Sequence, residues 1–105
     1  MNIPPPVDNI FTIYSKSNCI YCKKVEILLN EYFGENSNIN IRKNNCDVYL
    51  EDEKKKTFFI KFIENLANIT PKTFPIVFYD GKFIGGFEDT KEYLKCKTLK
   101  FDEDF

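Results

Sequence analysis

The amino-acid sequence predicts a small α/β protein in which a mixed four-stranded sheet is flanked by about three helices. The chain has 105 residues, the length of one domain with a core of its own. Its apolar residues alternate between short β-prone runs and longer runs with helical spacing, in the order β-α-β-α-β-β-α. Only Asp80-Gly81, a pair typical of hairpin turns, separates the last two β-prone runs. We expect one domain over residues 1–105, which begins with an extended, loosely packed arm at 1–9.

The first half of the chain predicts a strand–helix–strand unit. Residues 10–14 are almost continuously apolar, which is typical of a central strand that is buried on both faces and has a parallel neighbour. Apolar residues then recur at helical spacing from 22 to 32, and we expect this helix to end at Gly34. A polar loop over 35–38 is expected to lead into a short strand over 39–41, near an edge of the sheet.

The second half predicts a long helix, a hairpin and a last helix. Acidic residues at 51–53 precede lysines at 54–56, the order that a helix dipole favours, and we interpret this charged run as a solvated helix face. An apolar stripe extends the helix to about residue 68. Prolines at 71 and 75 then exclude a helix. Strands are expected at 76–79 and 82–84, and a last helix from 91 to about 97.

Two cysteines stand where the first strand passes into the first helix. Cys19 is expected at the start of the helix, near unpaired N–H groups and the positive end of the helix dipole. That position favours the thiolate, which is the nucleophile in disulfide exchange. Cys22 comes one turn later, close enough to attack Cys19, and is expected to be better buried with a higher pKa. The pair predicts a dithiol redox site with Cys19 and Cys22 as its catalytic residues.

Composition and charge exclude several other classes of protein. A net charge of −1 argues against a nucleic-acid-binding protein, which needs a basic surplus. No apolar run approaches the roughly 18 residues of a membrane span, and no secretory signal is visible, so we expect no membrane association. The alternative of a zinc site lacks further ligands close in sequence, since the chain has no histidine and Cys46 and Cys96 are distant. We therefore expect no metal site, and a reducing compartment such as the cytoplasm.

Four motifs in a fixed order carry a resemblance to a known family over residues 10 to about 96. They are Lys16, Cys19-Ile20-Tyr21-Cys22, Thr73-Phe74-Pro75 and Gly85-Gly86-Phe87-Glu88-Asp89. Together they resemble a dithiol glutaredoxin. The resemblance implies a thioredoxin-like fold, glutathione as co-substrate, and reduction of protein–glutathione mixed disulfides and protein disulfides. The expected partners are therefore glutathione and oxidised or glutathionylated proteins, with the chain acting as a monomer.

The resemblance also implies which residues bind glutathione. Lys16 and Lys72 fit positions near its glycine-end carboxylate, and Pro75 resembles the family's cis-proline, which frees the backbone of Phe74 for an extended ligand. Gly85 and its neighbours allow close approach and offer N–H groups at a helix start. The glutathione-binding residues implied in this way are Lys16, Tyr21, Lys72, Thr73, Phe74, Pro75, Gly85, Gly86, Phe87, Glu88 and Asp89. Each lysine could instead be a solvated surface charge.

Departures from the family pattern leave two further readings open. Ile20 replaces the proline common in dithiol glutaredoxins, and members without it sometimes bridge two subunits through a [2Fe–2S] cluster held by the first cysteine and glutathione. The chain could therefore be a cluster-binding carrier module. A thioredoxin-like reductant fits less well, because the chain lacks tryptophan and the Trp-Cys-Gly-Pro-Cys pattern. Phe74 for the family's valine, and Glu88 for an aspartate, serine or threonine, are smaller departures.

Overall fold

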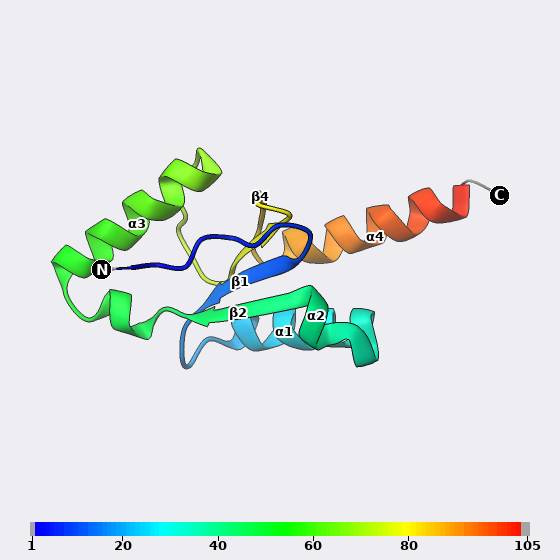
Figure 1. Cartoon of the computed structure of the whole chain (residues 1–105), viewed down its shortest axis with the longest axis horizontal. Coiled ribbons are helices and arrows are strands. Elements are labelled where there is room, and N and C mark those ends of the chain that lie inside the picture. The colour runs from blue at the N-terminus through cyan, green and yellow to red at the C-terminus, as the bar shows by residue number, and fades with distance from the viewer. Residues whose placement is uncertain (1, 104–105) are drawn as a thin grey trace.

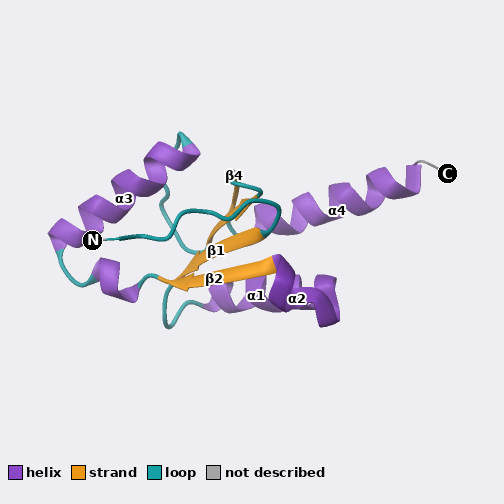
Figure 2. Cartoon of the chain, viewed as in Figure 1, coloured by secondary structure: helices purple, strands orange, loops and turns teal. Residues whose placement is uncertain are grey.

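The computed structural model describes residues 2–103, with side chains described through residue 97, and these residues form a mixed four-stranded sheet with helices packed around it (Figures 1 and 2). This is the predicted thioredoxin-like architecture. The elements in chain order are β1 (Phe11–Ser15), α1 (Ile20–Phe33), a 3₁₀ turn (Gly34–Asn36), α2 (Ser37–Asn40), β2 (Ile41–Asn45), a second 3₁₀ turn (Asp47–Leu50), α3 (Glu53–Ala67), β3 (Ile76–Tyr79), β4 (Lys82–Gly85) and α4 (Phe87–Glu103). Within residues 2–103, no helix combines the length and the apolarity needed to cross a bilayer.

The sheet has the strand order β2-β1-β3-β4. β1 lies inside it, parallel to β2 and antiparallel to β3, and every residue of β1 is buried. The prediction of a central strand covered on both faces is therefore confirmed, and β2 lies at the predicted edge. β3 and β4 form the predicted antiparallel hairpin around Asp80-Gly81.

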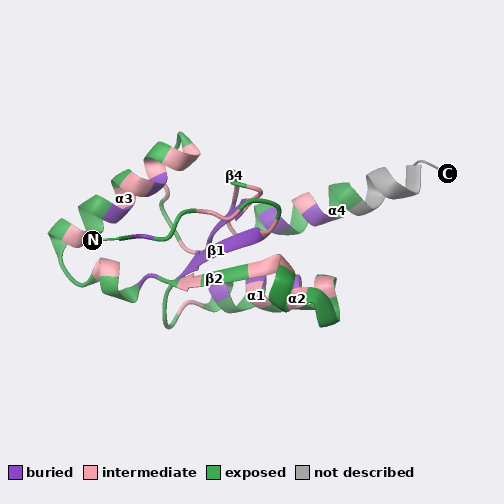
Figure 3. Ribbon diagram, in the orientation of Figure 1, coloured by how far each residue is buried: buried purple, intermediate pink, exposed green. Residues whose placement is uncertain are grey.

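The two faces of the sheet build separate cores, because alternate residues of a strand point to opposite sides. Phe11, Ile13 and Val77 pack with side chains from α1 and α4 on one face. Tyr14, Ile76 and Phe78 pack with side chains from α3 on the other. In Figure 3 β1 is buried along its length, whereas the edge strand β2 and the helices carry many exposed and intermediate residues. The end of β1 and the start of α1, which flank Cys19, thus belong to elements that are packed into these cores.

The prediction of a loop at 35–38 is wrong, and the second strand forms later than the predicted 39–41. Residues 34–40 form short helical turns, and β2 begins only at Ile41. Polar side chains stabilise these turns: the Ser37 hydroxyl donates to the Gly34 carbonyl at 2.7 Å, and the Asn40 amide donates to the Asn36 carbonyl at 2.9 Å. Ile39 has 72% of its surface exposed, so its alternation with Ile41 does not reflect a strand face.

The last helix begins four residues earlier than predicted, at Phe87, and runs to Glu103. Gly86 precedes it, and the Gly86 carbonyl accepts hydrogen bonds from the Thr90 N–H and hydroxyl at 3.0 and 2.8 Å. The Asp89 carboxylate reaches back to the Gly86 N–H at 3.1 Å. The Asp89 carboxylate thus satisfies the Gly86 N–H, a group at the helix start that lacks a partner within the helix.

The N-terminal arm packs more closely than predicted. Ile3 is buried in the core beneath α3, with 7% of its surface exposed. The Tyr14 hydroxyl donates to the Pro4 carbonyl at 2.6 Å, and the Val7 N–H donates to the Thr12 hydroxyl at 2.9 Å. Prolines give the arm its extended shape, while an apolar side chain and these bonds hold it against the sheet.

Candidate active site

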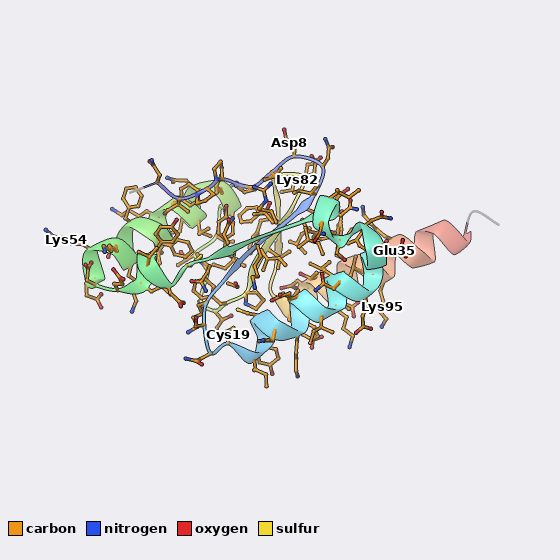
Figure 4. The ribbon with its side chains drawn as sticks, turned by 60° about the horizontal axis from the view of Figure 1, so that its bottom comes forward. Asp8, Cys19, Glu35, Lys54, Lys82 and Lys95 are labelled. Carbon is orange, nitrogen blue, oxygen red and sulfur yellow. The ribbon has the colours of Figure 1, made fainter. Side chains whose placement is uncertain are left out.

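Cys19 occupies the N-cap of α1, at the end of the loop that leaves β1 (Figure 4). Its backbone is extended, and its sulfur accepts a hydrogen bond from the Cys22 N–H at 3.2 Å. The side chain is half-buried and its thiol is free. A sulfur in this place receives an N–H that has no partner inside the helix, which stabilises negative charge on it. The structure thus brings Cys19 and Cys22 together with the predicted geometry.

Cys22 lies one turn further along α1 and is buried, with 4% of its surface exposed. Burial, together with a side-chain hydrogen bond to Cys19, raises the pKa of Cys22 to about 12. The expectation of a buried thiol with a high pKa is confirmed. At neutral pH this sulfur carries its proton, so it becomes a nucleophile only when the proton leaves during the reaction.

The loop before Cys19 is fastened to the end of β2 by one carboxylate. Asp47 accepts hydrogen bonds from both the backbone N–H of Ser17, at 2.9 Å, and the Ser17 hydroxyl. These bonds lower the pKa of Asp47 below its usual value. The Cys46 N–H also donates to the Ser15 carbonyl at 2.7 Å. These contacts join residues about 30 positions apart, so no local sequence pattern predicts them.

The loop over 69–75 approaches the cysteines from the other side. The Phe74–Pro75 peptide bond is cis, as the resemblance implies, and the Cys19 thiol lies 3.8 Å from the Phe74 carbonyl. The Phe74 ring stacks on Phe59 of α3, with ring centres 5.8 Å apart. The substitution of phenylalanine for the family's valine therefore extends the core beneath the loop and leaves its backbone beside Cys19.

Two adjoining hollows gather most of the residues to which the resemblance assigns glutathione binding. The first, here called the α3 pocket, has a volume of about 510 Å³ and is lined by Lys16, Tyr21, Leu50, Lys56, Phe59, Ile60, Pro71, Lys72, Thr73, Phe74 and Ile76. The second, here called the glycine pocket, has a volume of about 580 Å³ and is lined by Ile69, Thr70, Pro71, Lys72, Thr73, Pro75, Ile76, Phe83, Gly85, Gly86 and Asp89. They share the stretch 71–73 and Ile76. Together they make one surface beside the cysteines.

Aromatic and basic side chains frame the α3 pocket. The Lys16 ammonium lies 5.8 Å from the centre of the Phe74 ring. Tyr21 is half exposed, and its ring centre is 6.1 Å from that of Phe87, the first residue of α4. Lys72 is exposed and lines both hollows. Phe87 thus stands at the rim through its contact with Tyr21, while Glu88 is exposed and belongs to neither lining.

Gly85 and Gly86 leave room at the start of α4. A Cβ built on Gly85, whose φ is +135°, would lie only 2.2 Å from the Asp89 carboxylate. The Asp89 carboxylate also holds the Gly86 N–H. Gly85 is therefore required by the local structure, whatever ligand binds there, whereas a Cβ on Gly86 would make only an ordinary contact with the Pro75 carbonyl at 3.6 Å.

Sequence reasoning missed Lys56. We interpreted the run 54–56 as a solvated helix face, yet Lys56 lines the α3 pocket together with Lys16 and Lys72. The three lysines come from three separate segments, and this pocket has no carboxylate in its lining. No sequence pattern brings them together, so only the tertiary arrangement shows the convergence.

The remaining two cysteines, Cys46 and Cys96, differ from the dithiol pair in their surroundings. Cys46 is fully buried and burial raises its pKa to about 12, whereas Cys96 is exposed on α4. In the described part of the chain, histidine, cysteine, aspartate and glutamate form no group of three or more that could hold a metal ion.

Comparison with known proteins gives one family. The glutaredoxin family model matches residues 11–84. Glutaredoxin 1 from Francisella tularensis, complexed with cacodylate, is 26% identical with a TM-score of 0.59, over 86% of this chain and 95% of that one. Oxidised glutaredoxin 2 from Chlamydomonas reinhardtii is also 26% identical with a TM-score of 0.59, over 88% of this chain and 77% of that one. No curated protein matches.

A buckwheat glutaredoxin–glutathione complex shares the fold at 23% identity, with a TM-score of 0.62 over 87% of this chain and 73% of that one. At this identity the similarity supports the architecture of the sheet and helices alone.

Proposed function

Because the chain belongs to the glutaredoxin family of thiol–disulfide oxidoreductases, we propose that glutathione is its co-substrate and that it reduces protein–glutathione mixed disulfides and protein disulfides. The main support is the position of the Cys19 sulfur. This sulfur accepts a hydrogen bond from the Cys22 N–H at 3.2 Å and lies 3.8 Å from the Phe74 carbonyl, near two hollows that gather most of the residues implied for glutathione.

Reduction of a glutathionylated protein uses Cys19 alone. Its thiolate attacks the glutathione sulfur of the mixed disulfide, a Cys19–glutathione disulfide forms, and the protein sulfur leaves and takes up a proton. A second glutathione, as thiolate, then attacks the bound glutathione sulfur. Glutathione disulfide leaves, and Cys19 returns to its starting state.

Reduction of a disulfide within a protein also uses Cys22. Cys19 attacks one sulfur of the substrate and the other substrate sulfur leaves. Cys22 then loses its proton and attacks the Cys19 sulfur, so that a Cys19–Cys22 disulfide forms and the substrate is released as a dithiol. Since the pKa of Cys22 is about 12, the departing substrate sulfur is the natural acceptor of that proton. Two glutathiones then reduce the enzyme disulfide and leave as glutathione disulfide.

Glutathione carries two carboxylates and one ammonium group, and the hollows offer matching groups. Lys16, Lys56 and Lys72 around the α3 pocket suit its glycine-end carboxylate. The backbone of Phe74, next to cis-Pro75, suits an extended peptide. The start of α4, with Asp89 beside Gly86, suits the γ-glutamyl end, where the aspartate can pair with the ammonium.

The test is reduction of a glutathionylated peptide by glutathione, coupled to glutathione reductase and NADPH. Cys19→Ser should abolish turnover, and Cys22→Ser should retain it while losing most activity on a peptide disulfide. Full activity of the Cys19→Ser enzyme would refute Cys19 as the nucleophile. Equal loss of both activities in Cys22→Ser would mean that Cys22 supports the structure of the site instead of resolving intermediates.

The lysines have their own prediction. Lys16→Ala, Lys56→Ala and Lys72→Ala should each raise the KM for glutathione several-fold and change kcat less, because each exposed charge contact contributes roughly 1 kcal/mol or less. Lys61→Ala, on the exposed side of α3, is the matched control. Unchanged kinetics in all three variants, at both low and high salt, would make these lysines ordinary surface charges.

The cluster-binding alternative is tested on the same protein. Ile20, which replaces the family's proline, is 67% exposed beside Cys19. Cys19 and a bound glutathione would be the residue and ligand to hold a [2Fe–2S] cluster between two copies, and the cluster would supply an electron-transfer or carrier role. Brown protein from an anaerobic purification, with glutathione present, would favour this reading. Turnover with thioredoxin reductase in place of glutathione would favour a thioredoxin-like reductant.

A further inference from the structure

A third groove, here called the α1–β2 groove, opens beside Cys19 on the side of the sheet that carries β2. Its volume is about 620 Å³, and its lining includes Lys16, Cys19, Ile20, Lys23, Glu26 and Lys43. It lies between the first turns of α1 and the carboxyl ends of the parallel strands β1 and β2, a usual position for ligands in α/β sheets. The two hollows assigned to glutathione lie instead towards α3, β3 and β4.

The α1–β2 groove has a local surplus of positive charge, although the chain as a whole has a net charge of −1. Its lining holds three lysines and one glutamate. Glu26 forms an ion pair with Lys43 at 3.3 Å across the groove, from α1 to β2. Lys16 and Lys23 remain in excess. The nearby Asp47 carboxylate is engaged by the Ser17 N–H and hydroxyl, and it moderates the field at Lys16 without pairing with Lys23.

An apolar contact accompanies this charge. Ile20 follows Cys19 directly, lines the groove and exposes 67% of its surface. This side chain offers an apolar contact to a residue that neighbours the cysteine of a bound chain. The groove therefore combines a reactive sulfur, one apolar contact and two unneutralised lysines.

We propose that the α1–β2 groove binds the polypeptide segment around the reactive cysteine of a protein disulfide substrate, and that this segment is acidic. The inference rests on the proposed function. During reduction the substrate sulfur is bonded to Cys19, so the chain on either side of it must leave along a surface that adjoins Cys19. The α1–β2 groove provides such a surface, and the only lining residue that it shares with the two glutathione hollows is Lys16. Carboxylates next to the substrate cysteine would face Lys16 and Lys23.

The experiment compares two synthetic peptides of equal length, each with one intramolecular disulfide, flanked by glutamates in one and by lysines in the other. The measured quantity is the ratio of kcat/KM for the acidic peptide to that for the basic one. A change in the nucleophile itself affects both peptides alike and cancels in this ratio. The wild-type ratio should exceed about ten at 50 mM salt and fall towards one at 0.5 M salt, because salt screens exposed charges.

Two substitutions assign the preference to the groove. Lys23→Glu should lower the ratio about tenfold, and Lys43→Gln should lower it less, since it changes the charge of the groove by one unit, leaving Glu26 unpaired, where Lys23→Glu changes it by two. Lys43→Gln also serves if Lys23→Glu fails to fold. The matched control is Lys95→Glu on α4, which is outside the lining of the α1–β2 groove and is labelled apart from Cys19 in Figure 4; it should leave the ratio unchanged.

A wild-type ratio near one, or an equal shift in Lys23→Glu and Lys95→Glu, would overturn the proposal. Reduction of the glutathionylated peptide is measured in parallel. Where that reaction proceeds and the peptides show no preference, the α1–β2 groove assignment fails alone. Where neither reaction proceeds, the proposed function fails and the groove assignment fails with it.

Discussion

The four thiols of the chain should differ in reactivity by several orders of magnitude, and this can be measured without knowing any substrate. Cys22 and Cys46 are buried, with 4% and 0% of their surfaces exposed, and the pKa of each is about 12. Cys19 is half-buried and Cys96 is exposed. Treatment with iodoacetamide should therefore divide the thiols into two pairs.

The pKa fixes the size of the effect. Only the thiolate reacts, and at pH 7.5 a thiol with a pKa near 12 is ionised in about 3 molecules per 100,000. Burial hinders the reagent further. We expect Cys22 and Cys46 to be alkylated at least about a hundredfold more slowly than Cys96. Their rates should rise about tenfold per pH unit between pH 7.5 and 9.5, while the protein stays folded.

The assay is mass spectrometry of the alkylated and digested protein under reducing conditions. Cleavage after Lys16 and Lys23 leaves both cysteines of the dithiol in one peptide, so fragmentation is needed to locate the modification. In guanidinium chloride all four thiols should react at similar rates, which controls for peptide detection. If Cys22 in the native protein is alkylated at a rate within tenfold of that of Cys96, the argument from its burial and from its hydrogen bond to Cys19 is wrong.

Two further predictions concern the segments that frame the dithiol. Gly85→Ala should destabilise the fold by on the order of 1–3 kcal/mol from its positive φ alone, and by more because the new Cβ meets the Asp89 carboxylate. The control is Gly34→Ala, where φ is +56° and a Cβ would meet no atom within 4 Å. Equal losses of stability in thermal melts of the two variants would contradict the effect of the Asp89 contact. Asp47→Asn should lower stability at neutral pH and also slow turnover, with Ser17→Ala giving a similar effect. Because the pKa of Asp47 is lowered below 3.8, its contribution is present above that pH and lost as the pH falls, so the stability gap between wild type and Asp47→Asn should close in acid; a gap independent of pH would contradict the carboxylate's role.

The sheet and its long helices could be predicted because their residues repeat a simple pattern. The continuous apolar run before Cys19 describes a strand buried on both faces, and every residue of β1 is buried. Helical spacing and Gly34 fixed α1 in the same way. The cysteine pair and the Thr-Phe-Pro stretch could be assigned to one site because both belong to a known order of motifs.

Other elements depend on bonds between side chains and backbone that periodicity does not encode. The turns at 34–40 form because the Ser37 and Asn40 side chains bond to carbonyls three and four residues earlier. α4 begins at Phe87 because Asp89 reaches back to Gly86. In both places short polar side chains determine the local structure. The apolar pattern alone predicts a strand at 39–41 and a start of the last helix at residue 91.

The active site likewise combines a local sequence motif with contacts that the sequence pattern does not predict. Cys19 is held from two sides by segments that lie far from it in sequence: Asp47 fixes the preceding loop through Ser17, and the Phe74 carbonyl closes the other side, with its ring anchored on Phe59 of α3. A pair of cysteines two residues apart specifies a chemistry, whereas these tertiary contacts specify where the sulfur points and which surfaces adjoin it. Lys56 and the α1–β2 groove belong to those surfaces. Substrate preference in this protein should therefore depend on residues outside the four motifs, and the exchange of lysines around an intact dithiol should change what is reduced more than how it is reduced.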